Sequence, residues 1–121
     1  MSAIIDTSLL VGGSLEAEVD EDWAVSAVTV GELSAGVLLA TEPTRRASRL
    51  RRLTAVLQIA PVLPIDAAVA SRYGELRAAS GRRPTNALWI AATALAYGFT
   101  LVTADQEQAS LPLIRSALVA N

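Results

Sequence analysis

The 121-residue sequence contains no cysteine and no histidine. Without cysteine it can form no disulfide, no thiolate metal site and no cysteine nucleophile. Without histidine it lacks an imidazole base and the usual nitrogen ligand of zinc and iron. Its ten basic residues are all arginine, and the absence of lysine excludes a Walker-type phosphate loop. Carboxylates, hydroxyls and arginines are therefore the groups left for catalysis or binding.

The sequence also lacks the long hydrophobic segment of a membrane span, because Thr, Gly and Arg interrupt its apolar runs. The first residues, "MSAIIDTSLL", have no basic region and include Asp6, so they do not resemble a signal peptide. Apolar residues make up 52% and mean hydropathy is +0.41, which favours a packed core over disorder. The net charge of −2 gives no global basicity that would signal nucleic acid. We expect one domain over residues 1–121, no membrane partner and a cytoplasmic location.

Short apolar segments alternate with helical patterns along the chain. We expect strands in "SAIID", "WAVS", "PVLPID" and "FTLVTAD", with helices over most of the sequence between them. The segment "LWIAATALA" is apolar nearly all round and should be buried, ending at Gly98. The last segment, "SLPLIRSALVAN", fits either a strand or a short helix. This alternation predicts an α/β fold, a three-layer α/β/α sandwich with a short parallel sheet.

Several polar residues have the spacing of helix caps. Thr29 and Glu32 have capping-box spacing. Thr44 is a candidate N-cap for the helix over 42–60, and Asp66 for the helix that follows the "PVLPID" strand.

The helix over 42–60 has an amphipathic pattern. We expect its inner face to carry Leu50, Leu53 and Leu57. We expect an outer stripe of Arg45, Arg49 and Arg52.

Three acids, Asp6, Glu32 and Asp105, are flanked by apolar or small residues rather than lying in a charged run. Singly, each has a local interpretation: Asp6 could cap a short helix, Glu32 could pair with Thr29, and Asp105 could open a turn. Together they suggest more, because Asp6 and Asp105 end strands and Glu32 lies early in a helix that follows a strand. The carboxyl ends of parallel strands form the usual site of this fold. Clustered carboxylates need a cation, and Mg²⁺ or Mn²⁺ accepts oxygen ligands and can activate water for phosphodiester hydrolysis.

Five blocks of the sequence, in order, resemble those of PIN-domain ribonucleases and in particular VapC-type toxins of type II toxin–antitoxin systems. They are "IIDTSLL", "VSAVTVGELSAG", "VLPIDAAVASRYGELRAASGRRPTN", "LWIAATALAYG" and "LVTAD", and they cover nearly the whole chain. The resemblance implies a Mg²⁺- or Mn²⁺-dependent endoribonuclease that acts on RNA. It also implies a homodimer that a VapB-like antitoxin inhibits.

The same resemblance places the family's acids at Asp6, Glu32 and Asp105 as catalytic and metal-binding residues. Thr7 and Thr103 fall where the family has hydroxyls that support the site.

The family's remaining acid falls at Ala87, directly before the Leu of "LWIAATA". An alternative alignment by one residue would make Asn86 the replaced acid, but the distance to Asp105 favours Ala87. We therefore expect weakened metal binding and reduced or absent activity. The substitution is either a selected or deliberate change that makes a toxic nuclease tolerable, or natural degeneration, and the intact remainder of the site favours the first.

The arginines offer two candidate basic surfaces. Arg82 and Arg83 precede the helix with Ala87 and could hold substrate phosphates. The cluster on the helix over 42–60 is either a solvated surface, an RNA contact or an antitoxin contact; its members are Arg45, Arg46, Arg49, Arg51 and Arg52.

Two other functions compete with the nuclease. A catalytically inactive scaffold that binds antitoxin or RNA would also explain Ala87. A structure-specific DNA nuclease of related fold is less consistent with so short a chain.

Overall fold

The computed structural model describes residues 2–11, 22–81 and 83–119 of the chain. Its strands form a parallel sheet in the order β3-β2-β1-β4-β5. In register, Ile4 of the central strand lies between Ala24 and Leu101. The strands are β1 Ala3–Ile5, β2 Trp23–Ser26, β3 Val62–Leu63, β4 Thr100–Thr103 and β5 Ser116–Leu118. The predicted parallel sheet is confirmed.

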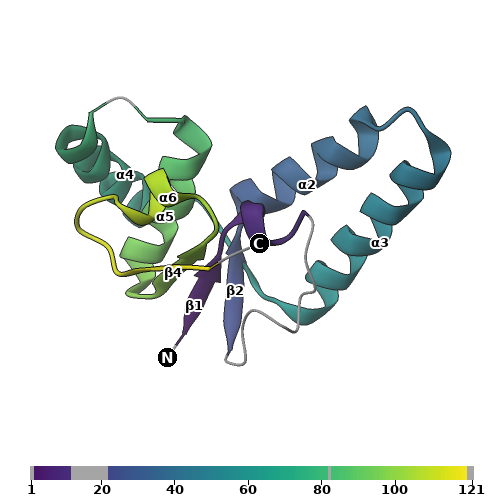
Figure 1. Cartoon of the computed structure of the whole chain (residues 1–121). Helices are drawn as coiled ribbons and strands as arrows, with labels where there is room; N and C mark the ends of the chain where they lie inside the picture. Colours follow the sequence, from purple (N-terminus) through teal and green to yellow (C-terminus); the bar gives the residue numbers. More distant parts are fainter. Residues whose placement is uncertain (1, 12–21, 82, 120–121) are drawn as a thin grey trace.

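Helices cover both faces of this sheet. They are η1 Thr7–Leu9, α2 Ala27–Leu39, α3 Pro43–Ile59, α4 Ala67–Ser80, α5 Thr85–Tyr97 and α6 Gln106–Ala109. The pair α4 and α5 lies on one side of β1 and β2, and the hairpin of α2 and α3 lies on the other (Figure 1). The arrangement confirms the three-layer α/β/α sandwich. None of the described helices is both long and apolar enough to cross a membrane.

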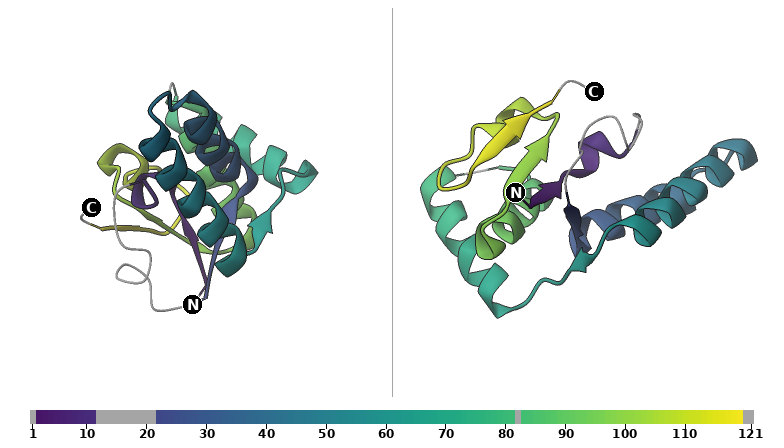
Figure 2. Two further views of the ribbon diagram at one scale, coloured as in Figure 1. Left: turned by 90° about the vertical axis from the view of Figure 1, so that its right-hand side faces the viewer. Right: turned by 90° about the horizontal axis from the view of Figure 1, so that it is seen from below.

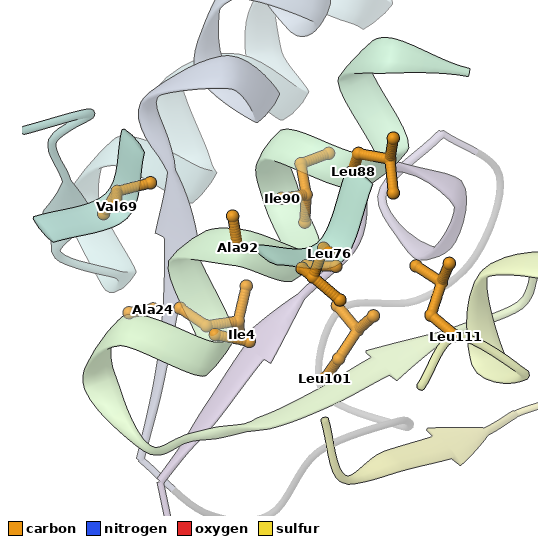
Figure 3. Close-up of a cluster of buried hydrophobic side chains, with 11 residues drawn as sticks. Ile4, Ala24, Val69, Leu76, Leu88, Ile90, Ala92, Leu101 and Leu111 are labelled. Atoms are coloured by element: carbon orange, nitrogen blue, oxygen red, sulfur yellow. The ribbon is translucent and has the colours of Figure 1, made fainter. Parts of the chain in front are cut away.

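The two hydrophobic cores follow from the alternation of side chains along each strand. Toward α4 and α5 the sheet sends Ile4, Ala24 and Leu101, which pack with Leu76 and Leu88 (Figure 3). The neighbouring strand residues point the opposite way. They pack against η1, α2 and α3 in a second core that includes Ile5, Val25, Leu33, Val56 and Val102. Strands buried on both faces need continuous apolar sequence, which is the pattern of "AII" and "LV" here.

Helix α5 is the buried scaffold that its composition predicts. Leu88 and residues 90–94 are buried. The helix ends at Gly98, whose φ of 71° and ψ of 26° lie in the left-handed region that favours glycine. Its first turn has no side-chain cap, since Pro84 occupies the N-cap position.

The predicted capping box of Thr29 and Glu32 is wrong. Helix α2 begins three residues earlier, and its N-cap is Ser26, whose side chain accepts a hydrogen bond from the Val28 N–H. Thr29 is instead buried inside the first turn. Glu32 therefore has no capping role.

The predicted cap of α3 is also wrong by two residues. Glu42 is the N-cap and accepts hydrogen bonds from the N–H groups of Thr44 and Arg45, while Pro43 takes the first helical position. Proline is favoured at the first helical position, because the backbone N–H that it lacks would have no acceptor within the helix there. Asp66, by contrast, caps α4 as predicted, accepting from the Val69 N–H.

The faces of α3 differ from the amphipathic prediction. Leu50 and Leu57 are 51% and 47% exposed, while Val56 is fully buried and Leu53 is partly buried. The hairpin of α2 and α3 projects from the sheet (Figure 2), so only one end of α3 meets the core.

The arginines of α3 do not form a single outer stripe. Arg49 donates a hydrogen bond to the carbonyl of Gly36 on α2. Arg49 and Arg52 line a pocket between the two helices; Arg45 and Arg49 are exposed as predicted, while Arg52 is partly buried.

The last segment resolves the choice left open by the sequence. Residues Ser116–Leu118 form strand β5, parallel to β4. The short helix α6 precedes it and was not predicted, since four residues carry too little periodicity to be recognised.

Candidate active site

Asp6, Glu32 and Asp105 line one pocket of about 300 Å³ at the carboxyl ends of the strands, and Ala87 lines it too. The other lining residues that the structure describes are Thr7, Ser8, Val11, Pro84, Asn86, Ile90 and Gln108. The four positions come from segments far apart in the sequence. The sheet brings them together because β1 and β4 are neighbours and β2 leads directly into α2.

Asp6 follows β1 and is only 7% exposed. Its Oδ2 accepts a 3.0 Å hydrogen bond from the Ser8 N–H, so it caps η1 as its local interpretation suggested. The hydroxyl of Thr103 lies 3.4 Å from the same oxygen. Among the described residues, no donor contacts Oδ1 of Asp6. One oxygen of this carboxylate is therefore available to the pocket.

Glu32 projects from α2 into the space between η1 and α5. The Thr7 hydroxyl donates to its Oε1 at 2.6 Å, and the Asn86 amide donates to its Oε2 at 3.3 Å. A short hydrogen bond to a carboxylate is a strong orienting contact. Thr7 therefore contacts one of the predicted acids, and its role as a supporting residue stays a prediction.

Asp105 is exposed and caps α6. Its Oδ1 accepts from the N–H groups of Glu107 and Gln108, at 3.0 and 3.5 Å. Its own N–H donates to the Thr103 hydroxyl at 3.0 Å. The local interpretation of Asp105 therefore holds as well, and its other oxygen has no described donor.

Thr103 connects both strand-end acids. Its fully buried hydroxyl lies at the end of β4, donates to Gln108 Oε1 at 2.7 Å and accepts from Asp105. The Ser8 hydroxyl, 3.4 Å away, accepts from the Ala104 N–H and ties η1 to the same strand end. These bonds fix the backbone that carries Asp6 and Asp105.

Ala87 occupies the first turn of α5, where a carboxylate would face the pocket. Gln108 donates to the Ala87 carbonyl at 3.1 Å and is 2% exposed. This buried amide joins the start of α5 to the end of β4. Sequence reasoning missed Gln108, although the Asp-x-x-Gln spacing from Asp105 is close to a capping box.

The two predicted substrate arginines have different outcomes. Arg83 is half-buried and lies beside the active-site pocket, sharing a small neighbouring cavity with Ala87 and Asp105. Arg82 lies outside the described residues.

The donors of the pocket match a hard divalent cation in kind, because they are carboxylate, hydroxyl and amide oxygens. They are not assembled as a ready site. Within the part of the chain that the structure describes, no three acidic side chains come close enough to hold a metal ion. Both oxygens of Glu32 are bound by Thr7 and Asn86, and position 87 supplies no charge. The residues therefore fit a metal in chemistry, while position 87 adds no carboxylate to them.

A parallel sheet with carboxylates at one end, between a helix hairpin and a buried helix, is the arrangement of a PIN domain. The PIN domain family model matches residues 3–113, and the chain belongs to this family. The expected resemblance to VapC-type members is confirmed at the level of sequence. Over 121 aligned positions, the chain is 41% identical to ribonuclease VapC4 of Mycobacterium tuberculosis, covering 91% of each. Ribonuclease VapC5 of the same organism is 35% identical over 91% of this chain and 87% of its own length.

The fold also matches a solved relative closely. A crystal structure of VapBC-5 from Mycobacterium tuberculosis, a member of the VapBC family of toxin–antitoxin systems, superposes with a TM-score of 0.83. Identity is 34%, and the match covers 99% of this chain and 98% of that one.

Proposed function

We propose that this chain has the design of a metal-dependent endoribonuclease toxin that a cognate antitoxin neutralises, and that Ala87 leaves it with reduced or no activity. One observation carries the proposal: Asp6, Glu32 and Asp105 line a single pocket together with position 87. Relatives with the printed name ribonuclease support the reaction class.

Asp6, Glu32 and Asp105 would hold Mg²⁺ or Mn²⁺ through their carboxylate oxygens. Such an ion supplies an activated water and neutralises charge on the phosphate. Thr7 keeps Glu32 directed at the pocket through its 2.6 Å hydrogen bond. Thr103 positions the backbone between the two strand-end acids. The pocket itself contains no basic residue in its described lining, so substrate phosphates need cations from adjoining surfaces.

An antitoxin and a second copy of the chain are the proposed protein partners. The solved relative belongs to a toxin–antitoxin system, which supports a VapB-like antitoxin here. The projecting hairpin exposes large apolar side chains, as expected of a surface that another chain covers. These are Leu38, Leu39, Leu50, Leu57 and Ile59. Both RNA and antitoxin would be met in the cytoplasm.

A catalytically inactive scaffold is the second candidate. The observation that favours it is the hydrogen bond from Asn86 to Glu32, which satisfies an acid that a metal would otherwise bind. In that case the chain would bind RNA or antitoxin without cleaving.

Restoring the carboxylate tests the proposal. We expect Ala87→Asp to cleave single-stranded RNA with Mn²⁺ or Mg²⁺ and to be toxic when expressed without an antitoxin. Adding Asp6→Asn to that variant should abolish cleavage while the fold is retained, as judged by circular dichroism. If Ala87→Asp folds but does not cleave RNA with either metal, the nuclease proposal is wrong.

A further inference from the structure

The carboxylate of Glu32 is held by two donors that differ in length and in burial. The Thr7 hydroxyl donates to Oε1 at 2.6 Å in a partly buried contact, and the Asn86 amide donates to Oε2 at 3.3 Å in an exposed one. The first length is typical of a strong hydrogen bond to an ionised oxygen, while the second is long for an N–H donor. The bond from Asn86 is therefore the one that breaks at lower cost.

The two donors also come from different parts of the fold. Thr7 directly follows Asp6 in the chain, so its contact keeps Glu32 beside the end of β1. The Thr7 hydroxyl also lies 3.0 Å from that of Thr29, which is buried in the same helix as Glu32. Asn86 reaches Glu32 from the first turn of α5, 54 residues further along the chain. Thr7 thus fixes Glu32 at the strand end, and Asn86 connects it to a separate helix.

The orientation that Asn86 helps to fix does not assemble a metal site. Asp6, Glu32 and Asp105 line one pocket. Among the acids that the structure places, however, no three are close enough together to hold a metal ion. The carboxylates must therefore shift before all three can contact the same ion. A shift of Glu32 can keep its contact with Thr7, because Thr7 adjoins Asp6 in the chain.

We infer that Asn86 holds Glu32 in a metal-free orientation, and that binding of a divalent cation breaks the hydrogen bond between them. The inference rests on the proposed metal-dependent function. An N–H that points at a carboxylate oxygen takes up a lone pair that a cation would otherwise use. Asn86 therefore competes with the cation for Glu32 and lowers the affinity of the pocket for it. Asn86 is a positioning residue, since it acts through Glu32.

Three substitutions in the first turn of α5 separate the amide from the bulk of the side chain. Asn86→Leu removes the N–H donor and keeps a side chain of similar size, whereas Asn86→Ala removes both. Thr85→Ala is the control, because Thr85 is the neighbouring residue, is exposed and is not a described lining residue of the pocket. Circular dichroism and thermal unfolding would verify that all three variants fold.

The experiment measures Mn²⁺ binding without RNA, from the electron paramagnetic resonance signal of the free ion. The three substitutions are made in the native chain and in Ala87→Asp. We expect both Asn86 variants to bind Mn²⁺ about two- to fivefold more tightly than their parent, because one weak hydrogen bond no longer has to be broken. Thr85→Ala should bind like its parent. Unchanged or weaker binding by both Asn86 variants would overturn the inference. A gain by Asn86→Ala alone would also do so, since bulk and not the amide would then be responsible.

A second readout follows the amide itself. The side-chain amide signal of Asn86 in a proton–nitrogen NMR spectrum is identified by its absence from Asn86→Leu. It should move toward the position of a free amide as Mg²⁺ saturates Ala87→Asp. A signal that stays unchanged at saturation would contradict the inference.

The results also separate this inference from the proposed function. If the Asn86 variants gain Mn²⁺ affinity while Ala87→Asp does not cleave RNA, the inference stands and the nuclease proposal fails. If Ala87→Asp cleaves RNA and the Asn86 variants gain no affinity, the nuclease proposal stands and the inference fails. No Mn²⁺ binding by any of these proteins would overturn the inference together with the proposed metal site.

Discussion

Thr7 donates a 2.6 Å hydrogen bond to Glu32, and this contact joins the strand-end segment after β1 to helix α2 across 25 residues of sequence. It is the shortest side-chain contact described at the site. Thr7 also lies 3.0 Å from the Thr29 hydroxyl, so its rotamer is held from two directions. This hydroxyl and the Asn86 amide hold the two carboxylate oxygens of Glu32 at the pocket.

Thr7→Val should therefore weaken the site without changing its charge. In the Ala87→Asp background we expect a loss of about 10–100-fold in metal affinity or cleavage, the usual effect of removing an outer-shell partner. Thr54→Val is the control, because Thr54 is exposed and its described hydrogen bond goes to the Leu50 carbonyl within α3. Steady-state cleavage and Mn²⁺ titration would measure both. Equal activity of the two variants would show that Thr7 does not orient Glu32.

Gln108 should contribute to the free energy of unfolding, in addition to connecting the end of β4 to position 87. Gln108→Leu removes a buried hydrogen bond from the Thr103 hydroxyl and a partly buried one to the Ala87 carbonyl. We expect a cost of about 1–3 kcal/mol in the free energy of unfolding. Gln106→Leu, on the exposed side of the same short helix, should change it little. Urea denaturation of both variants provides the comparison, and similar midpoints would contradict the assigned role.

Glu42 should make the stability of α3 depend on pH. Hydrogen bonds from the N–H groups of Thr44 and then Arg45 lower the pKa of Glu42 below its ordinary value of 4.5. A lowered folded-state pKa means that the ionised cap stabilises the fold above pH 4.5 and that this contribution fades as pH falls through the folded-state pKa. The Tm of the native chain should exceed that of Glu42→Ala above pH 4.5, and this difference should shrink as the pH is lowered through the folded-state pKa of Glu42.

Glu42→Ser gives the matching control for that titration. Serine is a good N-cap with no ionisable group. Its Tm advantage over Glu42→Ala should not change between pH 3 and 6, roughly the range in which carboxyl groups titrate. A pH-independent difference between the native chain and Glu42→Ala would refute the capping account.

The parts of the fold that sequence predicted are those with strong apolar patterns. Strand "AII" is buried and helix α5 is largely buried. Their nearly continuous apolar composition predicts this burial. Asp6 and Asp105 were found because an acid directly after a buried strand stands out. Their roles at the site remain predictions, while their meeting in one pocket follows from the adjacent positions of β1 and β4.

The predictions were wrong where tertiary contacts determine where a helix begins or which of its faces is buried. Thr29 has capping-box spacing, but the strand before it ends at Ser26 and the helix starts there. Leu50 and Leu57 fit an inward stripe, yet the projecting hairpin gives them no core to face. Gln108 was missed because a four-residue helix has no readable period. Among the described residues, the three acids line one pocket but do not come close enough together to hold a metal ion. Sequence could not predict this spacing, because it depends on where Asn86 and Thr7 hold Glu32.

The central claim is that position 87 is the missing member of a carboxylate metal site. The hydrogen bond from Asn86 to Glu32 at 3.3 Å makes Asn86 the competing position. Ala87→Asp and Asn86→Asp add the same charge one residue apart, so the pair separates the two alternatives.

Calorimetric titration of Mn²⁺ into the native chain and these two variants is the most direct test. Since even an outer-shell partner is worth about 10–100-fold in metal affinity, Ala87→Asp should bind Mn²⁺ at least about tenfold more tightly than the native chain. Asn86→Asp should gain clearly less. No gain from Ala87→Asp, or an equal or larger gain from Asn86→Asp, would contradict the assignment of position 87.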